Sequence, residues 1–450
     1  MKQSFLLREI VLILTITIGV LMVAVVHNFS MTLAIVPGFA ILLYFFYKKG
    51  YTHAHLRDAI TTGIKRNKEV AWLLMFVGMV LPTWKLAGTV EDMNTVFLSF
   101  ISADHFLMMT FLVTMLMSLV IGSAVGSLSV VGVPVMAAAG TIDVSLGYVA
   151  GALVSGAFVG DRTSPLSTSF QLIIHSLDLN VRRQLLRILP TLIGSVLVTV
   201  LAYFVMDLVV LDVEAGAFSS ENLDGLSTPQ LVISLLPPFV LMVAILWIGK
   251  TKHAFMLSIG TALVVLMIRG ESVIEWSTLI FTGFDSHTGI FSMLPFIVFI
   301  LVVGVFSQII EDTEMLQPYI DKVFTNSDSL TKNTWQTVGV AFGIAFISPN
   351  QSFPVILTGR ALKPHWEANF SKGQLGRIIA DTTVVFTGMV PWSMLALLCA
   401  ALVGVPVLDF VPFAFFLLIT PFMTILASWW TERRQAKRAY EVGEQHVSGM

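Results

Sequence analysis

Residues 155–169 read SGAFVGDRTSPLSTS, and this stretch decides how the rest of the chain is interpreted. The apolar residues 146–159 before it and residues 166–174 after it predict two helices. Gly160 favours a helix end, and Ser164 followed by Pro165 favours an N-cap with proline in the first turn. We therefore expect one helix to end and the next to begin between residues 160 and 164.

Such a break would give Asp161 an ion-binding environment. Carbonyls at the end of one helix and amides at the start of the next would point into one small volume beside its carboxylate. Carbonyl, hydroxyl and carboxylate oxygens are the hard ligands that a small alkali cation requires. Ionisable residues at membrane depth are costly and mark transport pathways. The alternative is an ion pair between Asp161 and the adjacent Arg162 at a cytoplasmic helix end.

The composition indicates that this stretch lies in a membrane. Of the 450 residues, 56% are hydrophobic and 12% are charged, against about 25% charged in a soluble domain. So few charges cannot cover the surface of a soluble protein of this size. A cytosolic enzyme, a secreted disulfide scaffold and a disordered protein are therefore excluded. The net charge of −2 gives no basic face for nucleic acid. The class that remains is an all-α polytopic membrane protein.

Several apolar runs approach the length of about 20 residues that a bilayer-crossing helix needs. They are residues 7–26, 29–47, 70–87, 106–121, 186–210, 231–248, 254–268, 290–310 and 410–430. Lys and Arg cluster after the second run and again near residues 182–187, 360–377 and 433–438, whereas residues 207–229 contain none. Because positive residues stay inside, both termini are predicted to be cytoplasmic and residues 207–229 to be external. Residues 48–69 are expected to be an interfacial helix or a solvated connector.

A second group of polar residues lies in the C-terminal half. Residues 347–354 read ISPNQSFP and place Asn350 and Gln351 between two prolines, ahead of Asp381, Thr382 and Thr383. In the first half, residues 121–129 read IGSAVGSLS and precede Asp161; this segment contains Ser123, Ser127 and Ser129. A broken polar segment about 30 to 40 residues before an Asp in each half is typical of inverted repeats that meet at a central site.

This pattern predicts a single transporter domain over residues 1–450, with discontinuous helices and re-entrant segments. Residues 70–210 and 231–430 would form the two repeat halves, preceded by residues 1–69 and followed by a cytoplasmic tail at 431–450. For Asp381 the alternative is an ordinary cap or an ion pair with Arg377 on the same helical face.

Enzyme motifs are incomplete in this chain, so we expect neither an enzyme nor a cofactor. No HExxH zinc motif occurs, and the GKT at residues 249–251 lacks the first glycine of a phosphate-binding loop, where Ala244 stands. Gly160-Asp161 lacks the earlier glycine of the GxGD motif of intramembrane aspartyl proteases, because that position is Phe158. A passive channel would need a continuous polar pore, whereas the polar residues here form two local groups.

Residues 156–167, GAFVGDRTSPLS, resemble the GA-[FY]-x-GD-[KR]-x-SPLS signature of the NhaC family of sodium/proton antiporters. Residues 84–89, WKLAGT, are similar to the family's W-x-x-[SA]-G-T segment, and residues 292–293, 309–316 and 350–392 resemble its later landmarks. The resemblance covers about residues 84–392. It implies a multi-pass protein of the inner membrane, with sodium as the coupling or transported ion, and such carriers are often homodimers.

Two positions depart from the family pattern. Thr168 stands where the family usually has Asp, and Val90 where it commonly has Pro. Loss of that carboxylate removes one candidate cation ligand or proton site and leaves the coupling ion, the stoichiometry and the substrate open. The wider family, by resemblance, also includes malate/lactate exchangers and amino-acid carriers.

These observations predict an antiporter that exchanges sodium for protons across the cytoplasmic membrane. Asp161 would be the principal sodium ligand and proton carrier, with Asp381 as a second ligand. Neutral oxygens would come from Ser164, Thr168, Asn350, Gln351, Thr382 and Thr383, and the path would include Ser123, Ser127, Ser129, Arg162, Arg360 and Trp392. The alternative is a sodium- or proton-coupled carrier of an organic anion or amino acid, with Arg162 or Arg360 holding the substrate carboxylate.

Overall fold

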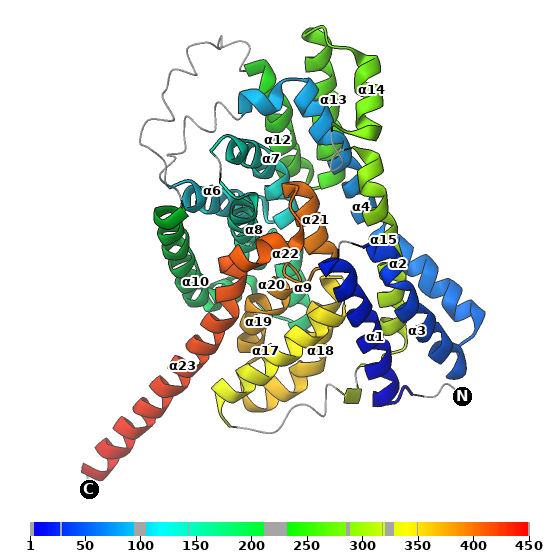
Figure 1. Ribbon diagram of the computed structural model, residues 1–450. Helices are drawn as coiled ribbons and strands as arrows, with labels where there is room; N and C mark the ends of the chain where they lie inside the picture. Colours follow the sequence, from blue (N-terminus) through cyan, green and yellow to red (C-terminus); the bar gives the residue numbers. More distant parts are fainter. Residues whose placement is uncertain are drawn as a thin grey trace.

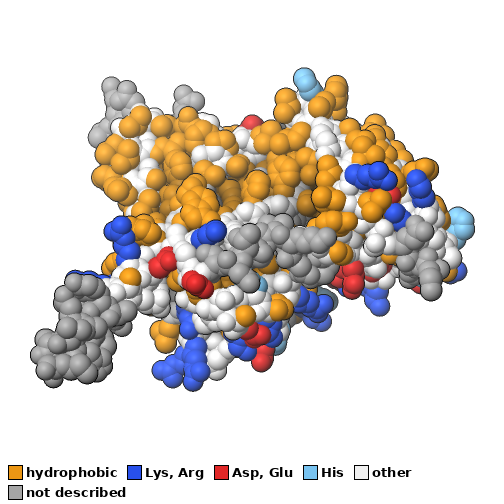
Figure 2. All heavy atoms as spheres, turned by 90° about the horizontal axis from the view of Figure 1, so that it is seen from below, with side chains coloured by type: hydrophobic (Ala, Val, Ile, Leu, Met, Phe, Trp, Pro, Cys, Tyr) orange, Lys and Arg blue, Asp and Glu red, His pale blue; other side chains and the backbone are white. Residues whose placement is uncertain are grey.

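The computed structural model describes residues 4–27, 29–93, 105–142, 144–210, 232–284, 289–316, 318–319, 328–348 and 350–448, and in these residues it contains helices and no strand. Seven of the described helices are long and apolar enough to cross a membrane. The side chains of Leu197, Leu201 and Leu208 lie on one face of a long helix and are 60–63% exposed. Figure 2 shows a broad hydrophobic area on one side of the molecule, with charged side chains gathered beyond its edge. The predicted all-α polytopic membrane protein is confirmed.

The N-terminal helices lie on the right side of Figure 1 together with α15 (Ile290–Asp312), which α4 and α2 contact. They are α1 (Leu7–Val26), α2 (Met31–Ala34), α3 (Val36–Lys48) and α4 (His53–Leu86). Most of residues 48–69, expected to be an interfacial helix or a solvated connector, is helical and belongs to α4, which continues without a break into the next apolar run. Its packing explains this: a Cβ at Gly63 would lie 2.8 Å from the Val305 Cα on α15, so the polar part of α4 is held against a neighbour.

A first set of helices carries the stretch at residues 155–169 and lies on the left side of Figure 1, with α9 near the centre. It consists of α6 (Phe106–Ile121), α7 (Ala124–Ile142), α8 (Leu146–Thr163), α9 (Thr168–Leu177) and α10 (Val181–Val210). α6 and α7 form a hairpin whose turn contains Gly122, in the left-handed region at φ 73°. Asp207 on α10 caps the start of α6, because its carboxylate accepts hydrogen bonds from the amides of Leu107 at 2.9 Å and Met108 at 3.0 Å.

A second set follows the same order after α12 (Leu236–Ile248), α13 (Thr251–Ile268), α14 (Val273–Thr282) and α15. A hairpin comes first, formed by α17 (Leu330–Ile347) and α18 (Ser352–Asn369). The next elements are α19 (Lys372–Asp381), α20 (Thr383–Phe386), α21 (Met394–Val403), α22 (Val407–Phe410), the 3-10 helix η3 (Val411–Phe413) and α23 (Phe415–Ser448). The long α23 extends away from the other helices at its C-terminal end (Figure 1).

The two sets interlock through equivalent contacts. The α7 arm of the first hairpin packs on α21, and the α18 arm of the second hairpin packs on α9. α6 contacts α10 as α17 contacts α23, and α8 contacts α23 as α19 contacts α10. The order of hairpin, helix, break, short helix and long helix thus occurs twice, and each copy completes the packing of the other. The predicted inversion of the halves stays a prediction, as does the external position of residues 207–229, of which residues 211–229 lie outside the described residues.

Candidate ion-binding site

The helix break beside Asp161 lies at residues 164–167, between α8 and α9. The cap of α9 is Ser167, whose Oγ accepts hydrogen bonds from the amides of Ser169 at 3.1 Å and Phe170 at 3.3 Å, and donates one to the Asp161 carbonyl. The predicted N-cap at Ser164 is therefore wrong. Ser164 Oγ instead donates to the Leu119 carbonyl at 3.0 Å, which ties the break to the end of α6.

Gly160 does not end α8 as its sequence position suggested. It lies inside the helix, where its amide donates to Ser118 Oγ on α6 at 3.1 Å. A side chain at this position would overlap with the backbone of Ser118. The glycine is needed for close approach of α6 to α8, which holds Asp161 in place one residue later.

This contact gives a prediction for stability. Gly160→Ala should lower the free energy of unfolding by about 1–3 kcal/mol, because the added methyl group forces α6 and α8 apart. Gly260→Ala on α13 is a matched control, since nothing lies within 4 Å of the added Cβ. Thermal unfolding of the two purified variants should show a lower midpoint for the first only; equal midpoints would contradict the assigned packing.

The Asp161 carboxylate is 5% exposed and is surrounded by neutral polar groups. Its Oδ2 accepts hydrogen bonds from Ser169 Oγ on α9 at 3.0 Å and from Gln351 Nε2 at 2.9 Å. Gln351 lies at the turn between α17 and α18, so the second set of helices supplies one partner and the first set the other. No basic side chain among the described residues forms an ion pair with Asp161, so the alternative of a pair with Arg162 is not observed.

Arg162 is instead paired with Asp381 across the two sets of helices. The Nη2–Oδ1 distance is 2.8 Å, and both side chains are fully buried. The guanidinium also lies over the ring of Phe416 on α23, 5.7 Å from its centroid. Arg377, the partner predicted by the alternative for Asp381, donates to Ser428 Oγ at 2.6 Å. The two aspartates named by the sequence therefore have different surroundings: one has neutral partners, and the other has a buried cation.

The other predicted ligands make different contacts, and not all of them face Asp161. Thr168 is exposed at the start of α9, and the neighbouring Ser169 faces Asp161 in its place. Asn350 Oδ1 accepts from the Ser352 amide at 2.9 Å and so stabilises the turn that presents Gln351. Thr382 Oγ1 donates to a carbonyl of its own helix, and Thr383 is buried beside it.

The predicted path residues are also spread over several environments. Ser123 Oγ accepts from the Gly126 amide at 3.2 Å, and the hydroxyls of Ser127 and Ser129 donate to the Ala124 and Val125 carbonyls of α7. Arg360 is exposed. In the described part of the chain, none of these four side chains forms a hydrogen bond or ion pair with Asp161.

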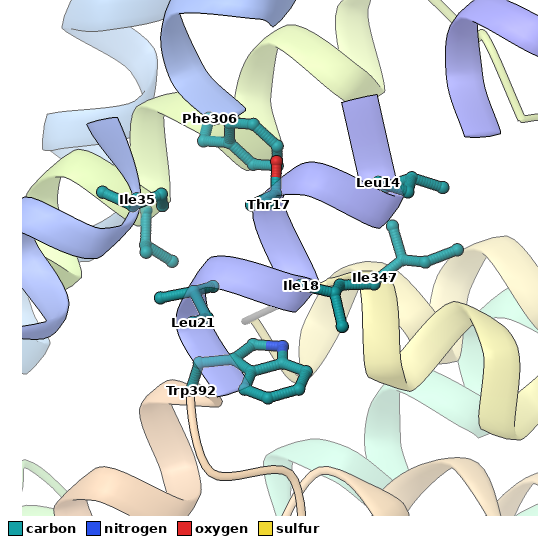
Figure 3. Close-up of a pocket in the computed structure, with 9 residues that line it drawn as sticks. Leu14, Thr17, Ile18, Leu21, Ile35, Phe306, Ile347 and Trp392 are labelled. Carbon is teal, nitrogen blue, oxygen red and sulfur yellow. The ribbon is translucent and has the colours of Figure 1, made fainter. Parts of the chain in front are cut away.

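Trp392 lies in the second break, between α20 and α21, and its Nε1 donates to the Phe346 carbonyl at 2.9 Å. Figure 3 shows its ring beside Leu21 and Ile18 of α1, around an apolar cavity of about 10 Å³ that is also lined by Ile347 and Phe306. This volume is about that of one water probe. The second break is thus covered by the N-terminal helix and is not open at this point.

Ser169, Ser167 and Ser118 were not predicted as site residues, although each contacts Asp161 or the adjacent Gly160. The run of hydroxyl residues after Pro165 could have indicated Ser167 and Ser169, because a helix that starts near residue 168 directs residue 169 back toward the break. Nothing in the sequence indicated that Ser118 would contact residue 160.

The described residues contain no group of three or more His, Cys, Asp or Glu suited to a metal centre. The carboxylate of Asp161, the hydroxyl of Ser169 and the amide of Gln351 all carry oxygens of the kind that ligate hard cations.

A buried carboxylate with neutral partners, set at a helix break between two interlocked sets of membrane helices, defines the class of ion-coupled secondary transporters. The comparisons agree with this class. The family model described as the Na+/H+ antiporter family matches residues 185–431, more than half of the chain. The chain belongs to this family.

Curated relatives cover most of the chain. It is 25% identical over 391 residues to the Na(+)/H(+) antiporter NhaC of Alkalihalophilus pseudofirmus, covering 82% of this chain and 84% of the relative. It is 23% identical to NhaC of Bacillus subtilis, covering 84% and 87%. It is 24% identical to the malate-2H(+)/Na(+)-lactate antiporter of Bacillus subtilis, covering 96% and 97%. The predicted relation of the chain to the NhaC family is therefore confirmed.

Proposed function

We propose that this protein exchanges sodium ions for protons and that both bind at Asp161. The observation that carries the proposal is the neutral setting of this buried carboxylate, with a hydroxyl and an amide 2.9–3.0 Å from one of its oxygens. A hydroxyl can turn its oxygen toward a cation, and an amide carries an oxygen as well as a nitrogen. Ser169 and Gln351 are therefore suited to ligate sodium when the carboxylate is ionised and to stabilise it when sodium is absent.

Burial supplies the coupling. An ionised carboxylate in a low-dielectric environment is strongly disfavoured without a cation or a proton. The loaded forms are therefore the ones that carry Asp161 between the two sides of the membrane, and the empty charged form crosses poorly. Sodium and a proton compete for the same oxygens, so only one of them is bound at a time. Because the empty site crosses poorly, one ion crosses outward and the other inward, and their fluxes run in opposite directions.

The arrangement of the helices supports a mechanism of alternating access. Gln351 belongs to the second hairpin and Ser169 to the first set, so relative movement of the two sets would open the ligand group on one side or the other. We extend the proposal to an inner-membrane location with cytoplasmic termini, based on the distribution of Lys and Arg, and to a homodimer, based on the family.

Reconstitution tests the proposed function. Proteoliposomes with an internal pH dye should become acidic inside when they are loaded with sodium chloride and diluted into sodium-free choline medium of the same pH, because each sodium ion that leaves down its gradient is exchanged for a proton that enters. The pH change should reverse sign when the sodium gradient is reversed. Equal responses to potassium and sodium, or no response above that of protein-free liposomes, would reject sodium/proton exchange.

A second candidate is exchange of small organic acids, favoured by the alignment of the malate-2H(+)/Na(+)-lactate antiporter over 96% of this chain. The same liposomes loaded with sodium lactate and given radioactive malate would detect it. Malate uptake that depends on internal sodium and lactate would support this candidate. Sodium-driven pH change without any uptake of malate would support simple cation exchange.

A further inference from the structure

The buried Arg162–Asp381 pair has a consequence for the charge that each transport cycle moves. We infer that Asp381 is the fixed counter-ion of Arg162 and not a second cation ligand, so that exchange is one sodium ion for one proton with no net charge movement. The inference rests on the proposed function and assigns its stoichiometry. It makes Asp381 and Arg162 positioning residues, which hold α8 and α19 together beside the site.

The first step is the geometry of the pair. The Arg162 Nη2 and Asp381 Oδ1 are 2.8 Å apart, and neither side chain has any exposed surface. Asp381 ends α19 and Arg162 lies in the last turn of α8, so the pair joins the two sets of helices at the level of Asp161. For Asp381 to bind sodium it would have to leave the guanidinium, and Arg162 would remain buried without a counter-ion. Burial strongly opposes such an uncompensated charge.

The second step is the balance of charges around the site. Besides Asp161, Asp381 and Arg162, α19 contributes the buried Arg377, whose guanidinium bonds to Ser428 on α23. α10 contributes Thr191, whose hydroxyl is 3.4 Å from Arg162 Nη2, and α23 contributes Phe416 below the guanidinium. The two carboxylates and two guanidiniums of this group balance when all four are ionised.

Asp381, Arg162 and Arg377 keep the same charges in both loaded forms, so only the ion bound at Asp161 changes between them. A sodium ion or a proton at Asp161 adds one positive charge to the group, and the added charge is the same for both. The sodium-loaded and the proton-loaded forms therefore carry equal charge. When one form moves outward and the other inward, the charges moved cancel, and the membrane potential neither drives nor opposes the exchange.

The wild-type protein gives the first test. Proteoliposomes with equal potassium on both sides, or with a tenfold outward potassium gradient, receive valinomycin so that the potential is zero or negative inside. The initial rate of sodium-driven pH change should be equal under the two conditions. A rate that changes several-fold with the potential would overturn the inference, whereas the absence of any sodium-driven pH change at zero potential would instead reject the proposed function.

A double variant gives the second test. Arg162→Gln with Asp381→Asn removes both charges and leaves Asp161 as the only acidic ligand. The sodium concentration at half-maximal rate should stay within about twofold of wild type, and the rate should stay independent of the potential, even if the maximal rate falls. A rise of about tenfold or more in that concentration, in protein that stays monodisperse, would show that Asp381 binds sodium.

A second buried pair in the same protein provides the matched control. Glu9 and Lys49 are 2.8 Å apart and 6–8% exposed, in the N-terminal helices away from the helix breaks. Glu9→Gln with Lys49→Gln should also leave the half-saturating sodium concentration unchanged. A rise confined to the Arg162 and Asp381 variant identifies Asp381 as a sodium ligand and overturns the inference. An equal rise in both double variants reports the general effect of removing a buried pair, and the wild-type potential measurement then decides the stoichiometry.

Discussion

Replacing Asp161 by Asn should reduce sodium-driven proton movement to the level of protein-free liposomes. Asn has the same shape and keeps an oxygen for Ser169 and Gln351, which bond to the carboxylate at 3.0 and 2.9 Å. It cannot bind and release a proton in the working range and brings no negative charge to sodium. The substitution therefore removes the exchange reaction and leaves the local packing in place. Internal pH recorded after sodium dilution measures the effect.

The control for this variant is Asp178→Asn. Asp178 is 90% exposed and pairs with Lys372 only at 3.5 Å, so its loss should leave the exchange rate unchanged. Both variants should elute as wild type in size-exclusion chromatography and unfold at similar temperatures. Sodium-dependent pH change that persists in the Asp161 variant would exclude this carboxylate as the shared binding group.

Replacing Arg162 alone by Gln should be the most destabilising single change at the site, by about 3–5 kcal/mol. It leaves Asp381 fully buried without the cation that lies 2.8 Å away. Removing both charges together avoids this penalty, so the double variant with Asp381→Asn should be more stable than the single variant. Thermal or denaturant unfolding in one detergent would compare the three proteins.

Lys372→Gln is the corresponding change at a surface pair, where solvent screens both charges. It should leave the unfolding midpoint where it is in the wild type. The account of the buried pair would be contradicted if Arg162→Gln were no less stable than Lys372→Gln, or if the double variant were less stable than the single one.

Much of the fold is encoded in local sequence. Apolar runs gave the bounds of α1 and α6 as they occur, and Pro165 with its neighbouring serines located a helix break. The cap was misassigned by three residues because Ser164 and Ser167 have the same capping chemistry, and tertiary contact with Leu119 engages the first. The polar part of α4 could not be assigned from sequence alone, since its neighbour α15 lies far along the chain.

The site was predictable in its residue types but not in its pairings. Asp161 was singled out because a buried carboxylate beside a break is unusual, and Gln351 because it lies between two prolines. Their contact joins residues 190 positions apart, which no local pattern contains. The same holds for Arg162 and Asp381. The sequence suggested pairs between near neighbours, Asp161 with Arg162 and Arg377 with Asp381, whereas packing of the two sets of helices pairs Arg162 with Asp381.

Proton release on sodium binding tests the central claim most directly. Purified protein in weakly buffered detergent solution, near the pH at which half of the molecules bind sodium, is titrated with sodium chloride while a pH indicator is followed. Competition at one carboxylate predicts saturable acidification that choline chloride does not produce and that Asp161→Asn abolishes. Saturable sodium binding without acidification, or equal acidification by the variant, would contradict a shared site at Asp161.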